Sequence, residues 1–139
     1  MRPDEEFNNE AKAWLRDAQS DIALSKVKKT KEIRYEHLCF HSEQAAEKSI
    51  KAVLIILCIN VPRTHDIAFL LDKLPEHSRL SVELVDLPVL TKYAVQFRYP
   101  GQEMSVSRKE YIRAVELAEA AVRWASRCVH AYCSGKTHK

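Results

Sequence analysis

Apolar residues recur at intervals of three and four along most of the chain, and this spacing predicts amphipathic helices. A first helix is expected over about residues 8–27, and a second over about residues 35–58. The last two turns of the second helix are apolar nearly all round, which predicts deep burial. The expected core face of the first helix comprises Ala11, Trp14, Leu15, Ala18, Ile22 and Leu24. That of the second comprises Leu38, Ala45, Ser49, Ala52, Val53 and Ile56.

Prolines and capping residues divide the rest of the chain. Pro62 disfavours helix in the residue before it, and Pro75 ends a short helix expected over about residues 66–74. A longer helix is expected over residues 78–99, interrupted near Asp86 and Pro88, which suit a cap and a first turn.

The last expected helix has the clearest beginning. Ser107 and Glu110 have the spacing of a capping box, in which each side chain bonds a free amide of the first turn. An apolar core stripe is expected along this helix. It comprises Tyr111, Ala114, Val115, Ala118, Ala121, Val122, Ala125, Cys128, Val129 and Tyr132. Together these patterns predict an all-α fold: an up-and-down helical bundle of about five helices, four long elements plus a short helix.

Composition supports one domain over residues 1–139, with a core of about residues 8–132 and a basic tail at 133–139. Only two glycines occur among 139 residues, which argues against a turn-rich β fold. The N-terminus lacks an apolar signal core, the longest apolar run is too short for a membrane helix, and the cysteines form no C-x-x-C pair. We therefore expect a cytoplasmic protein with reduced thiols that makes no membrane contact.

A basic stretch follows the first expected helix, although the formal charge of the chain is only +3. The simplest interpretation is a set of solvated cations that complement the dipole at a helix end. The alternative is a phosphate-binding edge. The residues concerned are Lys26, Lys28, Lys29, Lys31 and Arg34.

A polar stripe runs along the second expected helix at steps of four and three, so its side chains share one side of the helix. An ordinary solvated face, with the side-chain stems packed against neighbouring residues, is one interpretation. A groove for a phosphate or a base is the other, with Lys48 supplying charge, Gln44 hydrogen bonds, and His41 either role. The stripe consists of His37, His41, Gln44, Lys48 and Lys51.

The segment Phe97-Arg98-Tyr99-Pro100 is a second candidate binding element. An arginine beside an aromatic side chain can grip a phosphate or stack on a base. It can equally bond the last carbonyls of its helix, and spacing alone does not separate these roles. Gly-rich phosphate loops, H-E-x-x-H and paired-cysteine zinc patterns are absent from the sequence. No metal, cofactor or catalytic residue is therefore assigned.

Several segments resemble HEPN domains. The resemblance lies in residues 11–18 with Asp21 and Ile22, in residues 39–52, and in the loop from Pro62 to Ile67. The segment 98–100 and the last helix also fit, so the likeness covers about residues 10–130.

This resemblance implies a helical bundle that forms homodimers and carries a groove for a nucleotide or RNA near the dimer interface. It also implies a minimal nucleotidyltransferase as a partner, often in a toxin–antitoxin pair. The groove would be lined by His41, Gln44, Lys48, His65, Arg98 and Tyr99. Ribonuclease members of the family carry a histidine shortly after a late arginine, and none follows Arg98 through Ser105.

Three functions are therefore weighed. The first is a non-catalytic or weakly catalytic dimeric module that binds a nucleotide or RNA. The second is a metal-independent ribonuclease that uses Arg98 with a displaced histidine, His41 or His65. The third is a purely structural interaction domain.

Overall fold

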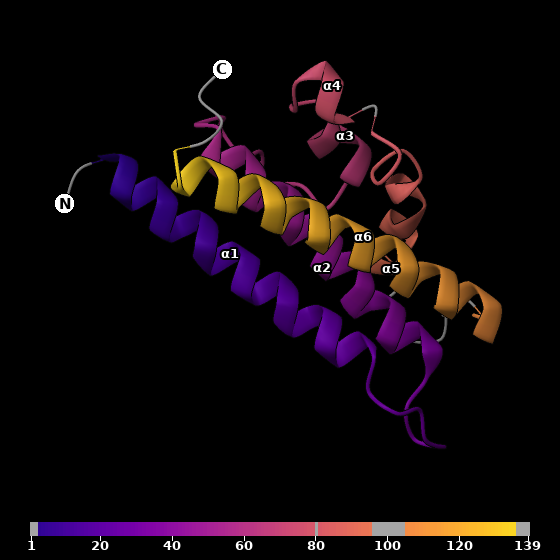
Figure 1. The fold of residues 1–139 in the computed structure, drawn as a ribbon. Coiled ribbons are helices and arrows are strands. Elements are labelled where there is room, and N and C mark those ends of the chain that lie inside the picture. Colours follow the sequence, from indigo (N-terminus) through magenta and orange to yellow (C-terminus); the bar gives the residue numbers. More distant parts are fainter. Residues whose placement is uncertain (1–2, 80, 96–104, 136–139) are drawn as a thin grey trace.

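Three long helices, α1 (Pro3–Ser25), α2 (Tyr35–Ile56) and α6 (Arg108–Cys133), run side by side in the computed structural model (Figure 1). The structure describes residues 3–79, 81–95 and 105–135. Within these ranges the other elements are short: α3 (Ile67–Leu71), α4 (Glu76–Arg79), the 3-10 helix η1 (Leu87–Thr91) and α5 (Lys92–Val95). No strand occurs among the described residues, and the expected all-α fold is confirmed.

The central helix is α2, which packs on both α1 and α6. The chain turns back between α1 and α2, and returns through the short elements, so that α6 runs in the same direction as α2 (Figure 1). Of these elements, α3, η1 and α5 pack against α2. Every residue from Ser49 to Ile56 is buried, as the apolar pattern predicted.

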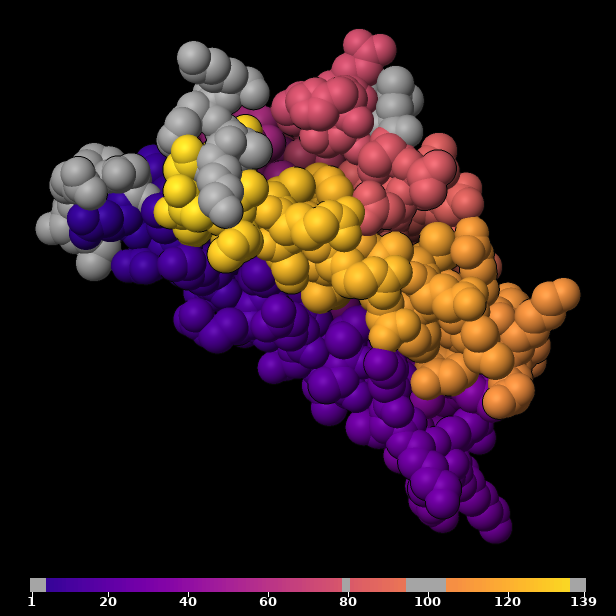
Figure 2. All heavy atoms as spheres, viewed as in Figure 1, coloured from indigo at the N-terminus to yellow at the C-terminus, as the bar shows by residue number. Residues whose placement is uncertain are grey.

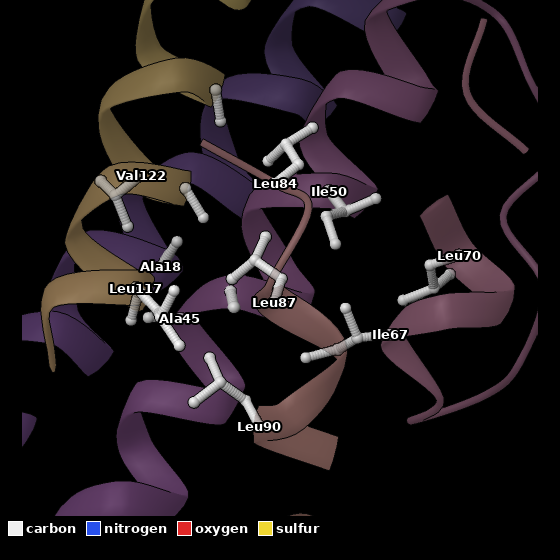
Figure 3. Close-up of a cluster of buried hydrophobic side chains, with 14 of the residues drawn as sticks. Ala18, Ala45, Ile50, Ile67, Leu70, Leu84, Leu87, Leu90, Leu117 and Val122 are labelled. Atoms are coloured by element: carbon white, nitrogen blue, oxygen red, sulfur yellow. The ribbon is translucent and has the colours of Figure 1, made fainter. Parts of the chain in front are cut away.

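The core is built from aliphatic side chains of α2, α6 and the short elements. Figure 3 shows Ile50 of α2, Leu117 and Val122 of α6, and Leu84 and Leu87 of the intervening segment turned toward one another. Four alanines of α6 are at most 2% exposed, and such small side chains allow close approach of the neighbouring helices: Ala114, Ala118, Ala121 and Ala125. Ser107 and Glu110 form the predicted capping box at the start of this helix.

The ends of the first two helices differ from expectation by a few residues. Helix α1 begins at Pro3, where a proline with acidic neighbours suits a first turn, and it ends at Ser25. Helix α2 ends at Ile56 because Cys58 adopts a left-handed conformation, with φ of 61°. The Ile59 amide then donates to the Leu54 carbonyl at 2.8 Å, which closes the helix as a Schellman motif.

The interrupted helix expected over residues 78–99 is wrong for the described residues 81–86, which form turns. The expected restart after Asp86 is found, with Pro88 in the first turn, but the element is the 3-10 helix η1. Leu84, Leu87 and Leu90 are fully buried at intervals of three, the period of a 3-10 helix. Asp86 precedes η1 without a capping bond, and its carboxylate instead accepts from Arg113 Nη2 at 2.9 Å. The short α4 was not predicted.

Two details of the predicted helical faces are also corrected. Leu24 is 47% exposed, and Tyr132, placed at the end of the core stripe of α6, is 36% exposed. In contrast, Leu117 and Trp124 are buried although the stripe omitted them. Among the described helices, none is both long enough and apolar enough to cross a membrane. All four cysteines are free thiols.

Candidate functional site

The polar stripe of α2 is progressively buried along the helix. His37 is exposed, His41, Gln44 and Lys48 are half-buried, and Lys51 is buried. Charged groups that are partly withdrawn from water need partners, and the structure provides them from other turns and elements.

Asp21 of α1 anchors the first half of this stripe. One carboxylate oxygen, Oδ1, lies 3.0 Å from Nδ1 of His41, and the other, Oδ2, lies 2.7 Å from Nζ of Lys48. The Asp21 side chain is 10% exposed, so these contacts are only partly screened by water. A single carboxylate of α1 therefore holds a histidine and a lysine of α2 in place, two turns apart.

Glu47 anchors the second half. Its Oε2 lies 2.6 Å from Nζ of Lys51, and its Oε1 lies 2.8 Å from Nδ1 of His65 in the loop before α3. The Glu47 side chain is only 3% exposed, whereas that of His65 is 57% exposed. The Lys51 ammonium also lies 5.5 Å from the ring centroid of Trp14, which ties α1 into the same cluster.

The two histidines are oriented in the same way by their carboxylates. An ionised carboxylate only accepts hydrogen bonds, so the Nδ1 atoms of His41 and His65 each carry the proton in these contacts. In a neutral ring, Nε2 then keeps its lone pair and is available as an acceptor or a base. When protonated, the same ring is a cation that suits a phosphate.

Glu43 lies beneath this face and is fully buried. Gln44 donates from Nε2 to Glu43 Oε1 at 2.7 Å, while Oε2 has no partner among the described residues. Burial, and next the negative charge of Glu47, raise the pKa of Glu43 to about 8. Glu43 therefore keeps its proton at neutral pH, and the Gln44 amide is already engaged.

The structure thus brings together four of the predicted site residues on or beside α2: His41, Gln44, Lys48 and His65. Arg98 and Tyr99 lie outside the described residues. Sequence reasoning missed the anchors Asp21 and Glu47. A signal existed for Asp21, because it lies on the apolar side of the first helix beside Ala18 and Ile22.

Two hollows in the described surface lie away from these residues. One of about 250 Å³ is bounded by η1, α5 and the start of α6, and one of about 300 Å³ by α4 and the C-terminal halves of α2 and α6. Neither includes His41, Lys48 or His65 in its lining. In the part of the chain that the structure describes, no three His, Cys, Asp or Glu side chains gather into a metal-binding group.

The fold and this face define a small helical-bundle domain with an anchored histidine–lysine cluster on its central helix. The family model described as the HEPN domain matches residues 11–128, most of the chain, and the chain belongs to that family. It is similar to the crystal structure of TT1696 from Thermus thermophilus. That likeness has a TM-score of 0.61 and 26% identity, and covers 92% of this chain and 99% of that one. No curated protein matches the sequence.

Proposed function

We propose that this HEPN domain is a dimeric module that binds a nucleotide or RNA and acts with a minimal nucleotidyltransferase, in a toxin–antitoxin type of system. The observation that carries the proposal is the shared Asp21 carboxylate, which holds His41 and Lys48 on one face of α2. Both side chains are half-buried yet reach solvent, with 32% and 23% exposure. Ligand-binding groups benefit from being held in this way, because less side-chain freedom is lost on binding.

In this proposal the ligand lies along α2. Lys48 contacts a phosphate, while the free Nε2 of His41 bonds a phosphate, a ribose or a base edge. Gln44 lies between them and is occupied by Glu43, so it supports the face more than it recognises the ligand. Arg98 and Tyr99 follow α5, which packs on α2, and they would complete the groove.

The homodimer is supported by apolar side chains on the surface. Val82, Val85 and Val89 are 90%, 56% and 50% exposed, and Ile112 of α6 is 39% exposed. An apolar surface of this kind favours contact with another chain. A second copy is the occupant we propose, and sedimentation analysis of the purified protein measures it directly. A monomer at all concentrations would count against this part of the proposal.

The binding part is tested by titrating the protein with ATP, GTP and a short single-stranded RNA. The wild type is compared with a Lys48→Ala/Arg98→Ala variant and with Lys12→Ala/Arg123→Ala, a control that removes two exposed cations. We expect saturable binding that is lost in the first variant and kept in the control. Because Lys48 also pairs with Asp21, the Tm of each variant is measured, so that loss of fold is not mistaken for loss of binding. If the wild type bound none of these ligands, the contacts of Asp21 with His41 and Lys48 would have only a structural role.

A second candidate, a metal-independent ribonuclease, is favoured by one observation. Glu47 orients His65 through Nδ1 while the His65 side chain remains 57% exposed, an arrangement suited to a general acid or base. We would follow RNA cleavage on gels in the presence of a chelator, with His65→Ala and Arg98→Ala variants. Cleavage by the wild type that both substitutions abolish would favour this function over binding alone. Equal cleavage by the variants would reject the mechanism.

A further inference from the structure

The positive charge of this protein is concentrated in the connection between α1 and α2. Residues 26–34 contain five cations and one carboxylate, so nine residues carry a net charge of +4. The whole chain carries +3, which leaves all other residues together slightly negative. This uneven distribution creates a positive potential around the connection, which the small net charge of the chain does not indicate.

The helix dipole does not explain these cations. Helix α1 ends at Ser25 and has no basic residue in its last turn. The dipole effect falls off within one turn, yet Lys28, Lys29 and Lys31 lie beyond it and are exposed. Figure 2 shows the connection projecting from the body of the molecule, beyond the adjoining helices.

The base of this connection is nevertheless fixed. The Lys29 ammonium lies 4.9 Å from the ring centroid of Tyr35, and that ring stacks on Tyr111 of α6 at 5.0 Å. Tyr111 also donates its hydroxyl to the Ser25 carbonyl at 2.8 Å, and Lys26 pairs with Glu119 at 2.6 Å. The connection is thus held against the first turns of α6.

The same end of the molecule carries two further cations from another element, because α6 begins there. Arg108 and Lys109 open α6 and are exposed, two to three residues before Tyr111. We call the resulting surface the basic end. It comprises Lys28, Lys29, Lys31, Arg108 and Lys109.

We propose that the basic end binds the phosphate backbone of single-stranded RNA and guides it toward the polar face of α2. Several exposed cations on two elements suit a ligand with repeated negative charges, and the partly exposed tyrosine pair beside them suits unstacked bases. Tyr35 begins α2, and His41 follows six residues later, about 9 Å along the helix axis. The proposal rests on the proposed function for its choice of RNA as the polyanion.

The test compares two triple variants that lose the same charge. Lys28→Gln/Lys29→Gln/Lys31→Gln alters the basic end, and Lys12→Gln/Arg16→Gln/Arg123→Gln alters exposed cations elsewhere on α1 and α6. Binding of a fluorescent twelve-nucleotide oligouridylate is measured by anisotropy over a series of salt concentrations. We expect the basic-end variant to bind at least about tenfold more weakly, with the salt slope reduced by about 2, because each phosphate contact contributes about 0.7 to the slope. The control variant should keep the affinity and the salt slope of the wild type.

Further ligands separate this proposal from its alternatives. ATP is too short to span the two surfaces, so its binding should survive in the basic-end variant and be lost in the Lys48→Ala/Arg98→Ala variant. Failure of ATP binding alone therefore rejects the groove and not the basic end. Equal losses of oligouridylate binding in the two triple variants would overturn the basic-end proposal. So would preferential binding of the wild type to vesicles of anionic lipid.

Discussion

The polar face of α2 and the basic end carry charge in opposite ways. On α2, Lys48 and Lys51 each meet a carboxylate at 2.7 and 2.6 Å, and the carboxylates Asp21 and Glu47 are nearly excluded from solvent. At the basic end the lysines are exposed, and the segment keeps a large positive excess. Buried, paired charges stabilise one arrangement of the fold, whereas exposed, uncompensated charges are free to act on a ligand.

Substitutions in the two regions should therefore affect the stability of the protein differently. Removing one partner of a buried pair leaves the other charge in a poorly solvated place and destabilises the protein. Removing an exposed cation changes the field around the protein and hardly changes its stability. The free energy of unfolding of variants therefore tests whether the charges on α2 are buried and paired and whether those of the basic end are exposed and uncompensated.

The largest effect is expected at Glu43, through pH. Its folded-state pKa, about 8, is above the ordinary value of 4.5, so between these values the folded state holds a proton that the unfolded state has released. This contribution to stability is complete below pH 4.5, falls on the order of 1.4 kcal/mol per pH unit as pH rises, and is lost by about pH 8. Glu43→Gln cannot ionise, so its advantage over the wild type should grow across the window to several kcal/mol.

Urea unfolding of both proteins at half-unit steps from pH 4.5 to 9 measures this difference. Glu10→Gln, at an exposed position of α1, is the matched control and should show a small and nearly constant difference. If the Glu43→Gln difference were equally constant, Glu43 would be ionised at neutral pH and the burial argument would be wrong.

The next largest effect is expected from Glu47→Ala. This substitution removes the partner of the buried Lys51 ammonium and the orienting contact of His65. We expect a loss of about 3 kcal/mol in the free energy of unfolding, because an unpaired cation remains in a poorly solvated position. A Glu47→Ala/Lys51→Met protein removes that cation too and should recover part of the loss. A single-variant loss below about 1 kcal/mol would mean that water reaches Lys51 freely.

Some parts of the fold could be predicted from the sequence, and others could not. Helical spacing predicted the three long helices, and the capping box located the start of α6 to the residue. Local sequence determines such features directly. The prediction from sequence failed over residues 81–91, where a three-residue apolar period and Pro88 produce turns and a 3-10 helix in place of a longer helix.

The candidate face on α2 was predicted only in part, because helix periodicity is local and the packing of other segments on the helix is not. The stripe of His41, Gln44 and Lys48 follows from the period of one helix, so it is visible in sequence. That Asp21 of α1 and His65 of the loop before α3 join this face depends on how these segments pack against α2, and that is a property of the tertiary fold. Asp21 and His65 lie 20 and 18 residues from the groups that they contact, beyond any local pattern.

The smallest effect on stability is expected at the basic end. Lys28→Gln/Lys29→Gln/Lys31→Gln should change the free energy of unfolding by less than about 0.5 kcal/mol, measured by urea unfolding at neutral pH. These lysines are close in sequence, so their mutual repulsion persists in the unfolded chain and largely cancels. By contrast, unfolding separates Asp21 from Lys48, which are 27 residues apart. A loss of about 2 kcal/mol in the triple variant would show that the lysines hold the connection in place, and the distinction between an anchored face and a free basic end would fail.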